Sequence, residues 1–182
     1  MRRTPAILTL VLLLLIAPAA KAGPPESWFI FDDILSLKQA EEIVEITRVY
    51  FWENGTLPPD GKPIRPRDEA ERQTIPIERM DALFFSQKAQ LAGLAMWCDL
   101  DPIPYAKHSL DAAWKKYRDL KQVVFASMLF GAVARDIKER KLSRGPCPAA
   151  DKEATATSIR YVMEKSNPAV QGTLRDKAAQ RP

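Results

Sequence analysis

The stretch VVFASMLFGAVA, residues 123–134, decides the fold. It contains no charged residue, and nearly every side chain in it is apolar. A helix that is apolar all round must be contacted from several sides, so we expect this segment at the centre of a helical core. Helical spacing continues on both sides and predicts one long helix over residues 105–142. The expected buried face comprises Leu110, Trp114, Tyr117, Leu120, Val124, Met128 and Ala132.

Another helix is predicted over residues 36–53. Ser36 and Gln39 have the spacing of a capping box, and Asn54-Gly55 is a frequent helix stop. The segment that follows, residues 57–75, is rich in proline and in charged residues, so it is expected to be a long loop with a short helical turn near Asp68. Loops of this length are functional or mobile, and we expect mobility. The apolar face of the helix comprises Ile43, Ile46, Val49, Tyr50 and Trp52.

Two further helices are predicted, over residues 76–100 and 148–165. Asp101-Pro102 marks a helix start after the first, and Gly145-Pro146 ends the long central helix before the second. No window alternates apolar and polar residues as a half-buried strand does. We therefore expect an all-α, bundle-like domain of four helices, or five. The apolar stripe of residues 76–100 comprises Met80, Leu83, Phe84, Phe85, Leu91, Leu94, Ala95 and Cys98.

The N-terminal residues have the layout of a cleavable signal peptide. Arg2 and Arg3 precede a short apolar run, and the small residues Ala20 and Ala22 frame a cleavage site before Gly23. The run is too short for a membrane-spanning helix, so we expect no stable membrane anchor after cleavage. The expected division is a signal peptide at 1–22, one helical domain at 23–166 and a polar, flexible tail at 167–182. The predicted location is the periplasm, or outside the cell.

The two cysteines, Cys98 and Cys147, are expected to form a disulfide between helices, because export exposes them to an oxidising compartment. The alternative is that Cys147 is a reactive thiol, since it precedes a predicted helix whose N-terminal dipole lowers a thiol pKa. The spacing of the two cysteines is not that of a disulfide oxidoreductase.

Removal of residues 1–22 changes the charge of the protein. The chain has a formal net charge of +4, and this segment holds Arg2, Arg3 and Lys21 and no acid, so the remainder has a charge of +1. A nearly neutral protein has no general field that attracts nucleic acid. We therefore expect no nucleic-acid partner.

Catalytic and metal-binding motifs are missing from the sequence. His108 is the only histidine, which excludes sites that need two. Asp99 and Asp101 lie near it in the sequence, and the three residues are the best candidates for a site at the turn before residue 105. We expect no catalytic residue, no metal site and no cofactor.

An aromatic cluster, Trp28, Phe29 and Phe31, precedes the first predicted helix. It is expected to cover the core, or alternatively to form a docking surface for another protein of the cell envelope.

Three hypotheses for function remain. The preferred one is a non-enzymatic domain that contacts an envelope protein; its oligomeric state is open. The second is a binding module whose central helices enclose a small apolar ligand. The third is a hydrolase that uses Asp99, Asp101 or His108. The second hypothesis depends on Trp97, Trp114, Phe125, Met128 and Phe130.

Overall fold

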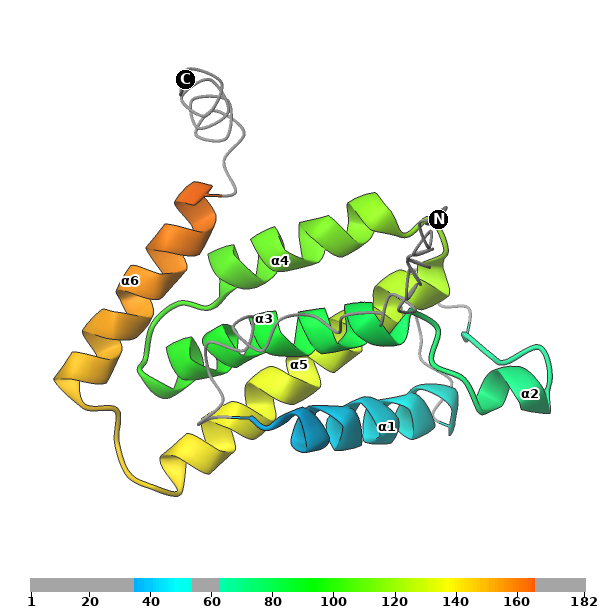
Figure 1. The fold of residues 1–182 in the computed structure, drawn as a ribbon, viewed down its shortest axis with the longest axis horizontal. Coiled ribbons are helices and arrows are strands. Elements are labelled where there is room, and N and C mark those ends of the chain that lie inside the picture. The colour runs from blue at the N-terminus through cyan, green and yellow to red at the C-terminus, as the bar shows by residue number, and fades with distance from the viewer. Residues whose placement is uncertain (1–34, 54–62, 166–182) are drawn as a thin grey trace, which may run out of the picture. The chain divides into compact units, whose positions relative to one another are not determined.

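The structure is a computed structural model that describes residues 35–53 and 63–165. Within these ranges it contains six helices and no strand (Figure 1). The prediction of an all-α bundle with an inter-helix disulfide is confirmed. The helices are α1 (Leu37–Glu53), α2 (Glu69–Arg72), α3 (Arg79–Trp97), α4 (Ile103–Lys116), α5 (Leu120–Leu142) and α6 (Ala149–Lys165).

Several predictions fall on residues that the structure does not describe. These are the signal peptide, the aromatic cluster Trp28, Phe29 and Phe31, and the C-terminal tail at 167–182. Among the helices that the structure does describe, none combines the length and the apolar character needed to cross a bilayer.

Helices α3 and α5 form the centre of the bundle and pack along each other. The stretch at residues 123–134 is central, as predicted, because its apolar side chains are almost all removed from solvent. In Figure 1, α1 and α4 lie on opposite sides of α3, and α6 crosses the end of the bundle where α3 ends. The buried residues of α5 are Val123, Phe125, Ala126, Leu129, Phe130, Val133, Ala134 and Ile137.

The prediction of one long helix over residues 105–142 is wrong, because α4 and α5 divide this segment. Tyr117 leaves the helix with extended backbone angles, φ −103° and ψ 134°. Asp119 then caps α5, and its carboxylate accepts a hydrogen bond from the backbone N–H of Lys121 at 2.9 Å. The hydrogen bond from the backbone to the Asp119 side chain competes with continuation of the helix from α4. A second helix therefore starts after Asp119.

The break between α4 and α5 also corrects the predicted buried face. Trp114 is 60 % exposed, and Leu120 is exposed as well, because the break shifts the helical phase. The side of α4 that faces the bundle carries Tyr105, Ser109 and Ala113 instead. A similar correction applies to α1, where Ile46 is 67 % exposed and Tyr50 is exposed.

The capping box at the start of α1 is confirmed. The Ser36 backbone N–H donates to Gln39 Oε1 at 2.9 Å, and the Gln39 backbone N–H donates to Ser36 Oγ at 3.3 Å. The short helical turn near Asp68 is α2, with Asp68 as its N-cap. Helix α6 matches the predicted helix at 148–165 to within one residue.

Candidate functional site

Asp99 and Asp101 lie at the turn between α3 and α4 and serve the ends of these helices. Asp99 has a positive φ of 53°, and the backbone N–H of the next residue, Leu100, donates to the carbonyl oxygen of Ala95 at 2.9 Å. This is the hydrogen bond that closes a helix when the residue after its cap is left-handed. The Asp101 carboxylate accepts from the backbone N–H of Ile103 at 2.9 Å and so supports the start of α4.

His108 is half-buried on α4. Within the described ranges, no hydrogen bond or ion pair connects it with Asp99 or Asp101, and no group of three or more histidine, cysteine or acidic side chains could hold a metal ion. The structure therefore gives both aspartates a local structural role and does not bring the three residues into contact as a site.

The disulfide joins the end of α3 to the connection between α5 and α6. Cys98 and Cys147 are bonded, with Cα atoms 5.0 Å apart, so neither is a free thiol and the alternative of a reactive Cys147 is wrong. A second bond reinforces this junction, because Trp97 Nε1 donates to the carbonyl oxygen of Gly145 at 2.9 Å. The ammonium of Lys141 lies 5.2 Å from the centre of the Trp97 ring.

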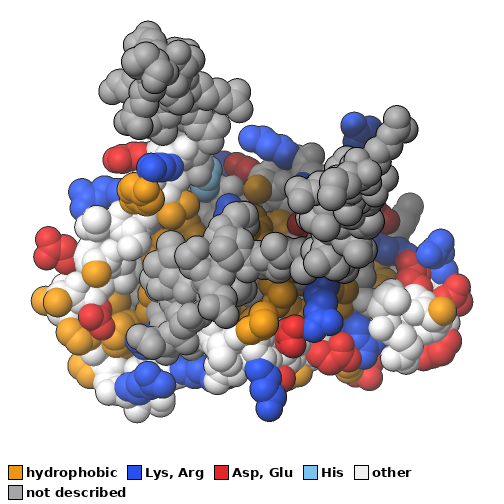
Figure 2. Space-filling model, viewed as in Figure 1, with side chains coloured by type: hydrophobic (Ala, Val, Ile, Leu, Met, Phe, Trp, Pro, Cys, Tyr) orange, Lys and Arg blue, Asp and Glu red, His pale blue; other side chains and the backbone are white. Residues whose placement is uncertain are grey.

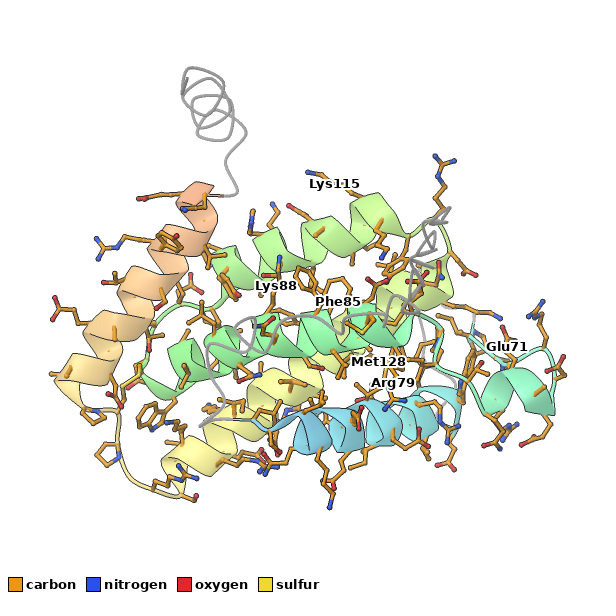
Figure 3. All side chains as sticks on the ribbon, in the orientation of Figure 1. Glu71, Arg79, Phe85, Lys88, Lys115 and Met128 are labelled. Atoms are coloured by element: carbon orange, nitrogen blue, oxygen red, sulfur yellow. A yellow bond between two sulfur atoms is a disulfide. The ribbon has the colours of Figure 1, made fainter. Side chains whose placement is uncertain are left out.

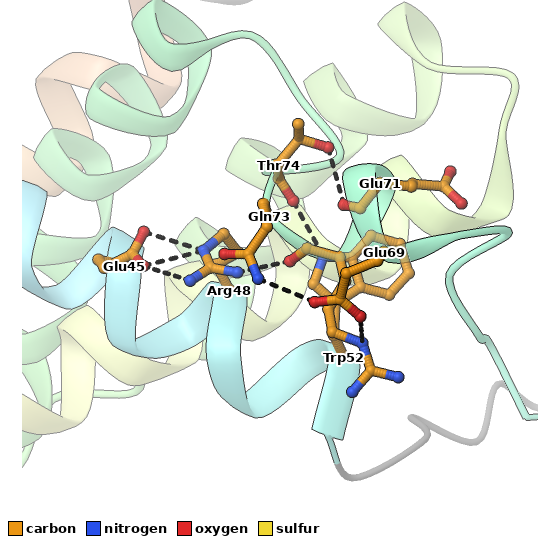
Figure 4. A network of polar contacts seen from close by, with 8 residues as sticks. Glu45, Arg48, Trp52, Glu69, Glu71, Gln73 and Thr74 are labelled. Atoms are coloured by element: carbon orange, nitrogen blue, oxygen red, sulfur yellow. Dashed lines mark hydrogen bonds and ion pairs between the residues drawn. The ribbon is translucent and has the colours of Figure 1, made fainter.

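A network of polar contacts attaches α2 and the residues after it to α1 (Figure 4). Trp52 Nε1 donates to the carbonyl oxygen of Thr74 at 2.9 Å, and the Arg48 guanidinium donates to the carbonyl oxygen of Arg72. Arg48 also pairs with Glu45, and this hydrogen bond lowers the pKa of the Glu45 carboxyl and raises the pKa of Arg48. Side chains of both charges crowd around α2 (Figure 2).

Glu71 connects α2 with the start of α5. Its carboxylate accepts from the backbone N–H of Arg67 and from Lys121 Nζ, the latter at 2.9 Å. These two hydrogen bonds, the backbone one first, lower the pKa of Glu71. The Glu71 side chain is only 17 % exposed.

The network gives the described part of the loop hydrogen bonds to α1 and α5, and its mobility stays a prediction. A hollow of about 360 Å³ lies between α1 and α2 and is bordered by Trp52, Arg67, Glu71 and Thr74. The Trp52 indole N–H donates to the Thr74 carbonyl oxygen, and the Glu71 carboxylate accepts from the backbone N–H of Arg67. The Thr74 hydroxyl donates to the carbonyl oxygen of Glu71. Groups that already have partners have little left to offer a ligand, so we interpret this region as a structural latch.

A groove between α1 and α3 has a different character. It encloses about 280 Å³. Val44, Ile75 and Leu83 supply apolar surface, and Glu41, Glu45 and Arg79 supply charge. Arg79 pairs with Glu41 across the groove, and its side chain remains 71 % exposed. Arg79 is labelled in Figure 3. The groove therefore combines an apolar lining with charged groups that solvent can reach.

Sequence reasoning did not find this groove. Its residues come from α1, from the segment before α3 and from α3 itself, and only the packing of the helices brings them together. Glu41 and Arg79 are 38 residues apart, and nothing in their local sequence indicates that they pair.

The four aromatic residues and the methionine considered for an apolar ligand site border neither hollow. Trp97, Phe125 and Phe130 are buried in the core, Met128 is half-buried beside it, and Trp114 faces solvent.

No protein-family model, no curated protein and no solved structure matches the chain.

Proposed function

We propose that the protein is an exported domain that acts by contact with another protein of the cell envelope, through the groove between α1 and α3. The groove carries this proposal, because an apolar lining surrounded by charged side chains is the usual organisation of a protein interface. Its volume of about 280 Å³ falls just below the roughly 300–1,000 Å³ of most small-molecule sites, which favours a protein side chain as its occupant.

The charges of the groove indicate the chemistry of the partner. Each carboxylate of the groove has a guanidinium beside it, because Glu41 pairs with Arg79 and Glu45 pairs with Arg48. The hydrogen bond from Arg48 lowers the pKa of the Glu45 carboxyl, and 60 % of that side chain is exposed and open to a cationic group of the partner. We expect the partner to insert an apolar side chain and to place a lysine or arginine beside it.

A photo-crosslinking amino acid at position 79 tests this proposal in intact cells. We expect an adduct of one discrete mass, and its crosslinked peptide should contain an apolar residue next to a lysine or arginine. The same photo-residue at exposed Lys152 on α6 is the matched control. Glu41→Lys reverses a charge on the rim and should remove the adduct without changing the circular dichroism spectrum. An equal adduct from position 152, or one that survives Glu41→Lys, would contradict the proposed groove.

Export is supported by the layout of residues 1–22 and by the disulfide, which is consistent with an oxidising compartment. We expect the mature chain, isolated from a native host, to begin at Gly23. Intact mass and N-terminal sequencing measure this, and a chain that retains Met1 in the cytoplasm would contradict export.

A further inference from the structure

Helix α4 exposes two large apolar side chains, Ile103 and Trp114, on an outer stripe that faces away from the bundle. Ile103, Lys107 and Trp114 recur at a spacing that places them on one side of the helix, and Leu110 at the edge of this outer stripe is half-buried against the core. The opposite side carries Tyr105, Ser109 and Ala113, which are buried. Ile103 is 69 % exposed and Trp114 is 60 % exposed. Lys115, next to Trp114, points away from the other helices (Figure 3).

Lys107 of the outer stripe and Asp111, one helical turn after it, form no ion pair within the described chain. Lys107 and Asp111 are exposed, and none of the ion pairs found among the described residues involves either of them. Exposed tryptophan and isoleucine beside unpaired charges of opposite sign indicate a surface that another protein can cover.

The order of these residues is self-complementary. A two-fold axis across α4 at the level of Ser109 would place a second α4 antiparallel to the first. Lys107 and Asp111 stand two residues before and after this level, so each lysine would meet the aspartate of the other copy. Ile103 and Trp114 lie at nearly equal distances on either side, so each isoleucine would meet the other tryptophan. An isologous interface requires this kind of match.

We propose that the protein forms a two-fold symmetric homodimer through the outer stripe of α4, with Ile103 and Trp114 as apolar contacts and Lys107 paired with Asp111 of the second copy. Helix α4 has 14 residues, so the contact extends over roughly 20 Å. This is a short interface, and the dimer is expected to dissociate on dilution. The surface shares no residue with the groove between α1 and α3.

Sedimentation equilibrium of the purified protein over a range of concentrations tests the dimer. Lys107→Glu should raise the dissociation constant by about tenfold or more, because the two-fold axis repeats the substitution in two contacts. Asp111→Lys should have a similar effect. The double variant Lys107→Glu/Asp111→Lys should restore dimerisation, since the exchanged charges again face each other. Trp114→Ala should also weaken the dimer, and its exposed position leaves the fold intact.

Lys152→Glu on α6 is the matched control and should leave the dissociation constant unchanged. A protein that is monomeric at every concentration would overturn the proposal. So would a dimer that tolerates Lys107→Glu, or one that the double variant fails to restore. None of these three results bears on the groove, which is tested by crosslinking at a separate surface.

Discussion

Gly93 of α3 lies directly against Ala134 of α5. A Cβ atom on Gly93 would be 2.6 Å from the carbonyl oxygen of Ala134 and 2.6 Å from the Cβ atom of Ile137. The carbonyl belongs to the helix backbone and Ile137 is fully buried, so neither group has room to move aside. The missing side chain of Gly93 therefore sets how closely the two central helices approach.

Gly93→Ala should lower the free energy of unfolding by about 2 kcal/mol, because the added methyl group overpacks the α3–α5 contact. Urea denaturation measures the change.

Gly131→Ala is the matched control, since Gly131 also lies in a central helix but has open space where an added Cβ atom would stand. There the substitution should stabilise the protein by about 0.5–1 kcal/mol through helix propensity. Effects of the same sign at both glycines would contradict the close approach at Gly93.

Removal of the disulfide should loosen α6 more than any other helix. Thr155 is the only buried residue of α6, so the disulfide just before α6 supplies much of the attachment of this helix to the bundle. The double variant Cys98→Ser/Cys147→Ser should be less stable by about 4 kcal/mol, as expected for a crosslink that spans 49 residues. Hydrogen exchange should show lost protection in α6 while α3 and α5 stay protected.

Trp97→Phe provides the comparison, because it removes the hydrogen bond to Gly145 and keeps the disulfide. Its cost should be smaller, about 1 kcal/mol, and α6 should remain protected. Equal loss of protection in both variants would show that the disulfide is not the main attachment of α6.

The contribution of Glu71 to stability should depend on pH. Its pKa is lowered in the folded protein, so the stabilisation is complete above the unfolded pKa of about 4.3 and is lost as the pH falls through the folded value. Glu71→Gln should therefore destabilise the protein by about 1 kcal/mol at pH 7, and the difference from wild type should shrink as the pH drops below about 4. Urea denaturation at pH 7 and at pH 3 measures both values.

Glu69→Gln is the control on the same short helix. The Glu69 side chain is mostly exposed and pairs only with Arg72 and Gln73 nearby, so its replacement should change stability little at either pH. A pH-independent effect of Glu71→Gln would contradict the role given to its ionised carboxylate.

The roles of Asp99 and Asp101 can be separated by substitution. Asp99→Gly should raise stability by about 0.5–1 kcal/mol, because glycine adopts the positive φ without a steric cost. Asp101→Ala should lower it by about 1 kcal/mol through loss of the bond to Ile103. Thermal unfolding of both variants measures the two signs, and destabilisation by Asp99→Gly would show that its side chain has another role.

Most helix boundaries could be predicted because local residues specify them. Ser36 with Gln39, and Gly145 with Pro146, act within a few residues of the chain. The end of α4 could not be predicted in the same way. The helical spacing of apolar residues continues through Tyr117 and so hides the end of α4. The capping signal of Asp119 occupies only three residues and is weaker than that pattern.

The faces of α4 were misassigned for a related reason. Ser109 and Ala113 are small or polar, so they do not indicate burial, whereas Trp114 does. The groove between α1 and α3 depends on contacts between distant segments, which hydrophobic periodicity does not report. The disulfide was predictable because the chain has only two cysteines.

The bond between Cys98 and Cys147 closes a covalent ring that contains α4 and α5 and leaves α1, α2, α3 and α6 outside it. A protease that cuts once between these cysteines would produce two fragments that still migrate as one species until a reductant is added. A cut before Cys98 would release the N-terminal fragment under either condition. A single cut inside the ring therefore releases no fragment until the disulfide is reduced, whereas a cut outside the ring releases one at once.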